Sequence, residues 1–240
     1  TMKERDQLDI DRIAFFGRTY AEYMSMFGLD ESMLKKGRIL DCPAGASSFA
    51  SEAHQQGIDV TACDILYNLD ADELFEKGKR DIQHVFEKFD EASHLYTWKY
   101  YKNKDEVMAL RNKALELFVE DFTGGLREGR YVHTELPHLL FPDKSFSLAL
   151  SANFLFLYGD RLDLDFHKAC IKELIRVCFG EVRIFPLVGL DAKPYPYLND
   201  VLGFLHSERI GFEIKKAPFE FQRGGNLMLK LYADKRCFAK

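Results

Sequence analysis

The segment from residue 37 to residue 67 limits the possible folds of this chain more than any other. Arg38 to Cys42 is a short apolar run before a proline, which is typical of a buried strand. A helix is expected from Phe49 to Gln56, ending at Gly57, and Ile58 to Ile65 supplies a second strand. The length of the crossover indicates parallel strands, so we predict a right-handed βαβ unit.

The rest of the chain continues the alternation of helices and strands. An amphipathic helix is expected over Asp9 to Phe27, before the first strand. Further strands are expected at 130–135, 146–152 and 180–187, and further helices at 165–178 and 197–208. The β-rich runs Phe212 to Phe221 and Asn226 to Ala233 flank a Gly-Gly turn and indicate a closing hairpin. The pattern predicts an α/β fold with a mostly parallel, doubly wound sheet and a C-terminal antiparallel hairpin.

Residues 71 to 128 form a longer connection between the second and third strands than an α/β sheet needs, since such loops usually take about 2 to 6 residues. The segment is highly charged but carries repeated aromatic residues. Helices are expected over Asp72 to Tyr101, with breaks, and over Asp105 to Phe122. We predict a helical insertion that covers the site as a lid. The 240 residues, 47% of them hydrophobic, suit a single domain over 1–240.

The composition argues against several classes of partner and location. The formal charge of −5 gives no general attraction to nucleic acid, which is not expected as a partner. No apolar run approaches the roughly 20 residues that cross a bilayer, so no membrane association is expected. The N-terminus is too charged for a signal peptide, and an odd number of cysteines without a CxxC pair favours a reducing cytoplasm. These cysteines are Cys42, Cys63, Cys170, Cys178 and Cys237. The sequence carries no indication of the oligomeric state.

The turn after the first strand has the composition of a ligand-binding turn. Small residues follow Asp41 at the carboxyl end of the strand, where open α/β sheets bind ligands and where a ligand can approach the backbone. Ser47 or Ser48 can cap the helix that follows. Asp64 ends the second strand, where a carboxylate can accept both hydroxyls of a ribose.

The same turn disfavours a dinucleotide. A nicotinamide-dependent oxidoreductase would place a pyrophosphate here on a G-x-G-x-x-G loop, which the sequence lacks. The carboxylate of Asp41 would also repel the phosphates, whereas it suits a ligand with ammonium and sulfonium groups. An oxidoreductase is therefore the less favoured alternative.

Residues 41–49, together with Asp64, resemble motif I of the class I S-adenosylmethionine-dependent methyltransferases, an Asp/Glu-x-Gly-x-Gly-x-Gly turn followed by an acid at the end of the second strand. The resemblance continues through Glu135 to Phe146 and Ser147 to Asn153, and it covers nearly the whole chain. The chain looks closest to small-molecule-type and uncharacterised bacterial members. The resemblance implies a Rossmann-like methyltransferase fold with seven strands and the cofactor S-adenosylmethionine, with S-adenosylhomocysteine as the product.

The resemblance also implies roles for individual residues. Asp41 and Gly45 would approach the methionine and ribose portions of the cofactor, Asp64 would hold the ribose, and Glu135 would contact the adenine amine. Pro43 stands at the first glycine position, where it fixes φ at about −65° and removes an amide donor. The complete set of predicted cofactor-binding residues is Asp41, Pro43, Gly45, Ser47, Asp64, Ile65, Glu135, Asn153 and Arg18.

Four of these positions also have a purely structural explanation. Asp64 can be a helix cap or turn former, although its position at a strand end beside the turn favours ribose binding. Asn153 can contact the methionine part of the cofactor or satisfy loop amides. Arg18 can pair with the cofactor carboxylate, although a surface arginine is the commoner outcome. Glu135 can be a solvated acid.

The predicted activity is methyl transfer to an O, N or C nucleophile of a small molecule. In-line displacement at the methyl carbon disperses the sulfonium charge, so positioning in a dry pocket can supply most of the acceleration. No catalytic residue is predicted, and His133, His167 and Tyr23 are only nominal bases for an acceptor that must lose a proton. The histidines have no recognisable metal spacing, so no metal is expected. The alternative is a domain that binds the cofactor as a sensor or partner subunit without catalysis.

Overall fold

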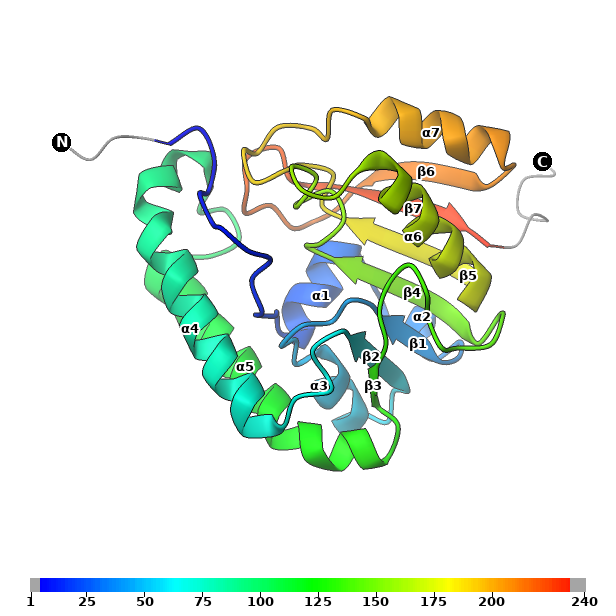
Figure 1. Cartoon of the computed structure of the whole chain (residues 1–240), viewed down its shortest axis with the longest axis horizontal. Helices are drawn as coiled ribbons and strands as arrows, with labels where there is room; N and C mark the ends of the chain where they lie inside the picture. Colours follow the sequence, from blue (N-terminus) through cyan, green and yellow to red (C-terminus); the bar gives the residue numbers. More distant parts are fainter. Residues whose placement is uncertain (1–4, 234–240) are drawn as a thin grey trace.

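A computed structural model describes residues 5–233 of the chain, and Cys237 lies outside the described residues. Its centre is a seven-stranded sheet in the order β3-β2-β1-β4-β5-β7-β6 (Figure 1). The strands are β1 (Ile39–Asp41), β2 (Val60–Asp64), β3 (Tyr131–His133), β4 (Phe146–Ala152), β5 (Cys178–Phe185), β6 (Gly211–Lys216) and β7 (Leu227–Tyr232). All neighbours from β3 to β5 pair in parallel, whereas β7 is antiparallel to β5 and β6. The predicted fold class is confirmed, including its closing hairpin.

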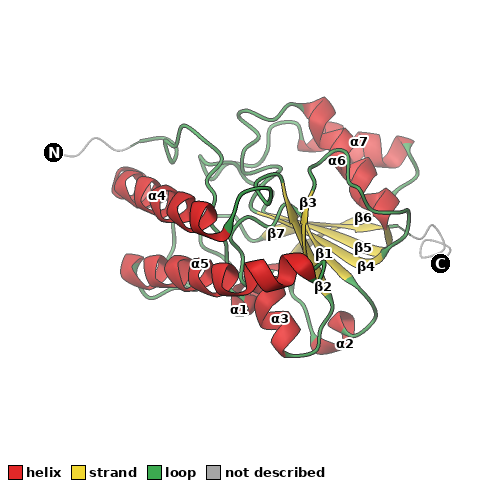
Figure 2. Ribbon diagram, turned by 60° about the horizontal axis from the view of Figure 1, so that its bottom comes forward, coloured by secondary structure: helices red, strands yellow, loops and turns green. Residues whose placement is uncertain are grey.

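Helices cover both faces of the sheet. Figure 2 shows α6 and α7 on one side and α1 and α3 on the other. The helices outside the connection between β2 and β3 are α1 (Tyr20–Phe27), α2 (Glu31–Leu34), α3 (Phe49–Gln55), α6 (Leu164–Val177) and α7 (Leu198–Ser207). This arrangement buries the sheet on both faces, as parallel strands require.

The central strands are mostly apolar and buried because both of their faces are covered. Every residue of β1 and β2 is buried. In β4, Leu148 and Leu150 join the hydrophobic cluster on the side of α1, α3 and α5, whereas Ala149 joins the cluster on the side of α6 and α7. Successive side chains of a strand point to opposite faces, so one short run of sequence contributes to both cores.

The predicted helix over Asp9 to Phe27 is wrong in its first half, because α1 begins only at Tyr20. Thr19 caps the helix in a reciprocal capping box with Glu22. Residues 5–18, hereafter the N-terminal strap, form no helix, although several of their apolar side chains are buried. Ile10 is thus buried although the chain here is irregular, whereas Ile13, which shares the helical spacing, is 41% exposed.

The N-terminal strap crosses the turn between β1 and α3 at very short range. An added Cβ at Gly17 would lie 2.1 Å from the backbone nitrogen of Ser47, so only glycine fits there. The backbone N–H of Phe15 donates to the buried carboxylate of Asp81 over 2.7 Å. These contacts explain why a continuous helix cannot form through this segment.

Two long antiparallel helices occupy the connection between β2 and β3 (Figure 1). They are α4 (Ala71–Phe89) and α5 (Lys104–Arg127), and the 3-10 helix η1 (Asp90–Leu95) follows α4. The first helix therefore ends earlier than the expected Tyr101, and the second continues beyond Phe122. The two helices approach closely at Gly78, where an added Cβ would lie 2.5 Å from a methyl group of Leu115.

The C-terminal half of α5 also serves as the crossover helix of the sheet. Phe118 and Phe122 pack against Tyr67, which follows β2, and against Tyr131, which begins β3. One continuous helix thus joins the core of the sheet to the outer wall of the insertion.

The last expected strand run, Phe212 to Phe221, is too long, because β6 ends at Lys216. Residues 217–226 form a loop before β7, and Phe219 and Phe221 of this loop are buried. The loop returns over the carboxyl end of β5, where it contributes to the site.

Candidate active site

A cavity of about 470 Å³, hereafter the main cavity, lies at the carboxyl ends of β1, β2, β3 and β4. Its lining includes residues 13–18 of the N-terminal strap and four short segments that follow strands: 42–45, 64–66, 134–136 and 152–154. Open α/β sheets bind ligands at this edge. The volume falls within the range of about 300 to 1,000 Å³ that is usual for small-molecule sites.

Five backbone amides of the turn between β1 and α3 are hydrogen-bonded within the protein. They donate to protein oxygens as follows: Ala44 to Cys63 O, Gly45 to Asp64 Oδ2, Ser47 to Ala44 O, Ser48 to Arg18 O, and Phe49 to Ser47 Oγ. Gly45 has φ 55°, in the left-handed region that favours glycine. These amides are therefore not available to hold a pyrophosphate, in contrast to the first turn of a dinucleotide site.

Asp64 organises the turn and faces the main cavity. Its Oδ2 accepts from Gly45 N at 3.0 Å and its Oδ1 accepts from Leu66 N at 2.9 Å. Burial raises the pKa of this carboxyl, and the two amide hydrogen bonds oppose the shift. Each oxygen still has a further lone pair, so the carboxylate can accept two hydroxyl groups from the cavity.

Asp41 lies behind the wall of the main cavity. Its side chain is fully buried, Oδ1 accepts from the hydroxyl of Tyr23 at 3.0 Å, and Oδ2 has no hydrogen-bond partner among the described residues. Burial raises the pKa of this carboxyl well above its ordinary value. Tyr23 lines the cavity and Asp41 does not, so Asp41 reaches the cavity only through its hydrogen bond with Tyr23.

Ser47 is also outside the cavity lining. Its hydroxyl donates to Arg18 O at 3.1 Å and accepts from Phe49 N at 3.1 Å. The side chain thus holds the N-terminal strap to the start of α3. Of the two serines proposed as a cap for this helix, only Ser47 accepts a hydrogen bond from a backbone amide at the start of the helix.

The remaining predicted residues all line the main cavity: Pro43, Ile65, Glu135, Asn153 and Arg18. Glu135 and Ile65 are exposed, and Ile65 keeps 51% of its surface accessible. Asn153 follows β4 with φ 51°, and its backbone N–H donates to Phe185 O at 2.7 Å. The structure therefore brings seven of the nine predicted residues to one cavity, counting Gly45 and Asp64 and leaving out Asp41 and Ser47.

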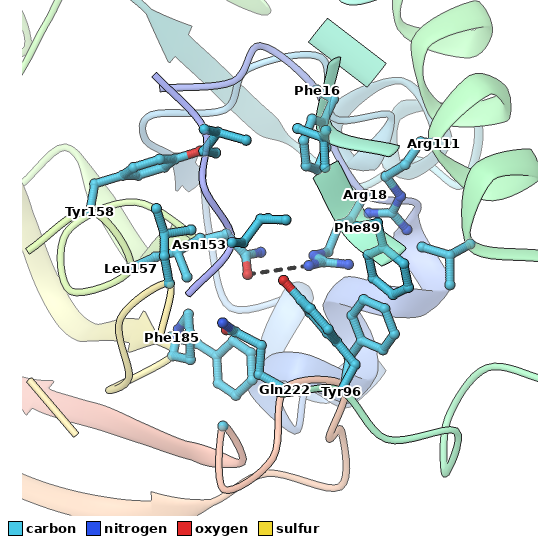
Figure 3. Close-up of a pocket in the computed structure, with 18 of the residues that line it drawn as sticks. Phe16, Arg18, Phe89, Tyr96, Arg111, Asn153, Leu157, Tyr158, Phe185 and Gln222 are labelled. Atoms are coloured by element: carbon cyan, nitrogen blue, oxygen red, sulfur yellow. Dashed lines mark hydrogen bonds between the residues drawn. The ribbon is translucent and has the colours of Figure 1, made fainter. Parts of the chain in front are cut away.

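A second, smaller cavity of about 70 Å³, hereafter the side cavity, adjoins the first. The two share Phe16, Arg18, Asn153, Leu157 and Tyr158 as lining residues. Figure 3 shows Arg18 and Asn153 in the middle of this region, with the Tyr96 hydroxyl facing them and aromatic side chains around. The wall is mostly apolar and is supplied by the N-terminal strap, both insertion helices and the loop before β7.

A buried charged cluster closes one side of the side cavity. Glu22 of α1 accepts from Arg111 of α5, from the hydroxyl of Tyr101 and, at 3.5 Å, from Arg18. Burial opposes ionisation of Glu22, but the guanidinium groups of Arg111 and Arg18 outweigh it and lower the pKa to about 2. Arg18 also donates to Asn153 Oδ1 at 3.4 Å, so the cluster reaches the border between the two cavities.

Sequence reasoning missed Glu22 and Arg111. A charged residue in an amphipathic helix is usually solvated, and nothing in composition alone distinguishes Arg111 from its neighbours. The available signal was spacing, because Arg111 falls on the same helical face as Val107, Leu115 and Phe118. An arginine in an apolar stripe is buried with the stripe.

The nominal bases do not meet at the site. His133 is exposed, and the buried ring of His167 lies between the carbonyl oxygens of Asp163 and Leu155. Neither histidine lines either cavity, whereas Tyr23 does. Its hydroxyl is engaged with Asp41, and burial raises its pKa well above the ordinary value.

Residues 5–233 offer neither a metal centre nor a membrane-spanning helix. No cluster of three or more His, Cys, Asp or Glu side chains in this range is arranged to hold a metal ion. Within the same range, none of the helices combines the length and apolar character that a membrane span requires.

No family model matches the chain. The uncharacterised protein MJ0045 of Methanocaldococcus jannaschii is 33% identical over 229 residues, which cover 92% of this chain and 97% of that protein. The chain belongs to the MJ0045 family. Because MJ0045 is itself uncharacterised, membership of the MJ0045 family assigns no substrate.

Solved methyltransferase structures align with this MJ0045-family chain at low identity. Magnesium protoporphyrin IX methyltransferase from Synechocystis PCC 6803, with bound S-adenosylmethionine, gives a TM-score of 0.46 at 12% identity over 89% of this chain and 77% of that chain. An S-adenosylmethionine-dependent methyltransferase from Aquifex aeolicus gives 0.41 at 17% over 94% and 93%. A possible histamine N-methyltransferase from Thermotoga maritima gives 0.43 at 11% over 89% of each chain. The fold itself is established by the strand order and the single reversed strand β7, the arrangement that the resemblance to class I methyltransferases implies.

Proposed function

We propose that the protein is a methyltransferase that binds S-adenosylmethionine in the main cavity and transfers its methyl group to an O, N or C nucleophile of a small molecule. The observation that carries the proposal is the first turn, where five backbone amides donate to protein oxygens and the carboxylate of Asp64 faces the cavity. A turn of this kind accommodates a ribose and a cationic chain, and it offers no cradle to a pyrophosphate.

From its outer to its inner end, the lining of the main cavity suits the adenine, the ribose and the methionine part of the cofactor in turn. Asp64 would accept the ribose hydroxyls, and the exposed Glu135 and Ile65 would border the adenine at the outer end. At the inner end, Arg18 would pair with the methionine carboxylate beside Asn153. This order directs the reactive end of the cofactor toward the side cavity, because Arg18 and Asn153 line both.

The cofactor would supply an electrophilic methyl group, and the protein would supply position and dryness. The side cavity is walled by aromatic and aliphatic side chains, so an acceptor bound there would lose most of its water. Holding the nucleophile in line with the methyl group can provide a large part of the rate enhancement. The absence of His133 and His167 from both linings favours an acceptor that reacts without a dedicated histidine base.

Calorimetry with three ligands tests the cofactor proposal. S-adenosylmethionine and S-adenosylhomocysteine should bind with one-to-one stoichiometry, and NADH should produce no heat. Tight NADH binding with no response to S-adenosylhomocysteine would reverse the assignment in favour of the oxidoreductase.

Transfer is tested separately with methyl-labelled cofactor and a panel of small-molecule acceptors. Incorporation into any acceptor supports the enzyme. Cofactor binding without transfer to any member of a broad panel would favour the sensor or partner subunit, which needs the main cavity but no acceptor.

We further propose that α4 and α5 shape acceptor specificity, since Val85, Phe86, Phe89, Val107 and Arg111 of these helices line the side cavity. Cytoplasm is the proposed location. The four described cysteines are buried free thiols, as is usual in a reducing compartment.

A further inference from the structure

We infer that the methyl acceptor carries a carboxylate, which Arg111 binds inside the side cavity. The inference rests on the proposed function and specifies its substrate class. Its basis is a buried guanidinium that faces the cavity with most of its donors unused.

Arg111 is buried among apolar neighbours and is only 1% exposed. It donates through Nη2 to Glu22 and to the Tyr101 hydroxyl, whereas Nε and Nη1 have no hydrogen-bond partner among the described residues. Arg111 also belongs to the lining of the side cavity. Buried donors of a charged group are costly when unpaired, so this side of the cavity requires oxygen acceptors.

Glu22 cannot supply those acceptors, because each of its carboxylate oxygens already accepts at least two hydrogen bonds. Oε1 accepts from Arg18, Tyr101 and Arg111, and Oε2 accepts from the backbone and the hydroxyl of Thr19. With a pKa of about 2, Glu22 is ionised and contributes one negative charge. Arg18 and Arg111 contribute two positive charges, so the cluster has an excess of one cation.

No other carboxylate compensates for this excess at the side cavity. Among the described residues, its lining contains two arginines and no aspartate or glutamate. The nearest buried acid on α4, Asp81, is paired with Lys77 at 3.0 Å and accepts the amide of Phe15. Arg18 also has an unpartnered Nε, and it would turn toward the methionine carboxylate in the main cavity. With that carboxylate bound the cluster is neutral, and what remains for an acceptor carboxylate is the pair of unpartnered donor atoms on Arg111, Nε and Nη1.

The rest of the side cavity specifies an apolar, planar acceptor body. Its wall includes Phe86, Phe89, Tyr96, Phe219 and Phe221. Aromatic side chains favour rings in stacked or edge-on contact. With the carboxylate at Arg111, the opposite end of such an acceptor points toward Asn153 and the main cavity, where methyl transfer would occur (Figure 3).

Benzoate and benzamide provide a matched pair of probes, since they share shape and differ in charge. Each is titrated by calorimetry into the full-length protein, both free and saturated with S-adenosylhomocysteine. We expect benzoate to bind at least tenfold more tightly than benzamide in both states. Equal affinities, or no binding of benzoate at millimolar concentration, would overturn the inference.

Two conservative variants identify the residue responsible. Arg111→Lys keeps a cation beside Glu22 and hence the fold, but it loses the Nε and Nη1 donors, so the preference for benzoate should fall at least tenfold. Arg38→Lys is the control, because Arg38 contacts Thr61 and Phe146 far from the cavity lining, and its preference should equal that of the wild type. An unchanged preference in folded Arg111→Lys would place the anion elsewhere and refute the inference.

The titration with S-adenosylhomocysteine separates the two proposals. Failure of this ligand to bind, with the Arg111-dependent preference for benzoate intact, would reject the cofactor and keep the carboxylate site. Binding of S-adenosylhomocysteine without any preference for benzoate would reject the carboxylate site and keep the cofactor.

Discussion

The ribose role of Asp64 gives the most direct quantitative prediction. Replacing Asp64 by alanine removes two carboxylate oxygens that face the main cavity and that also hold the amides of Gly45 and Leu66. The change should therefore weaken S-adenosylhomocysteine binding for two reasons, a lost ligand contact and a loosened turn. The experiment must distinguish them.

The magnitude follows from the number of hydrogen bonds. A hydrogen bond to a charged group contributes about 1.5 to 3 kcal/mol, so the loss of two from the ribose hydroxyls should cost at least about 3 kcal/mol. That is a rise in Kd of about 100-fold. Removing a single hydroxyl from the ligand should cost the wild type about 1.5 kcal/mol, or roughly tenfold in Kd.

A double-mutant cycle with the 2′-deoxy analogue of S-adenosylhomocysteine isolates the contact. Calorimetry gives the Kd of both ligands for both proteins, and the melting temperature reports the state of the turn. Wild type should discriminate against the analogue about tenfold, and Asp64→Ala should not discriminate at all. If the two proteins discriminate equally, Asp64 does not hold the ribose, however much the affinity itself has fallen.

Three further predictions concern stability, measured by urea unfolding. The pKa of Asp41 in the folded state lies above the ordinary 3.8, so the folded state retains a proton that the unfolded chain loses. The free energy of unfolding of the wild type should therefore fall relative to that of Asp41→Asn as pH rises from 4 to 9. Parallel plots of unfolding free energy against pH for the two proteins would contradict this. Gly17→Ala should lower the free energy of unfolding by about 1 to 3 kcal/mol, because its Cβ would meet the backbone of Ser47. The control Gly203→Ala, in open space on α7, should raise it by up to about 1 kcal/mol. A Gly17→Ala variant as stable as the wild type would refute the close crossing. Glu22→Gln should lower the free energy of unfolding by about 3 kcal/mol at pH 7. The difference from the wild type should vanish as pH falls from 4.5 through about 2, because the stabilisation requires the ionised carboxylate. A difference that does not change with pH would rule out the ion pair as its source.

The fold was largely predictable because the strands of a parallel sheet are continuous apolar runs. Residues 39–41 and 60–64 stand out in the sequence for that reason, and Gly57 separates the helix from the second strand. The strand order came from the resemblance and not from these runs, since local pattern does not encode which strands are neighbours.

The errors have a common physical origin in tertiary contact. The N-terminal strap has helical spacing of apolar residues, but a Cβ at Gly17 would lie 2.1 Å from the backbone nitrogen of Ser47. No local rule reveals that the strap crosses the first turn so closely. Glu22 and Arg111 lie 89 positions apart in the sequence, and they form their buried ion pair only in the folded chain. Conversely, Asp64 and Gly45 were predictable because the end of one strand and the turn after its neighbour always meet in this topology.

The continuity of α5 restricts how the two cavities can open. Arg111 and Phe122 belong to one rigid helix and are separated by about 16 Å at 1.5 Å per residue, with the first residue in the acceptor wall and the second in the core of the sheet. A wall anchored in this way cannot hinge outward without exposing Phe118, Phe122 and Tyr67 to water. We therefore expect the insertion to stay in place during ligand exchange, as a fixed template for the acceptor.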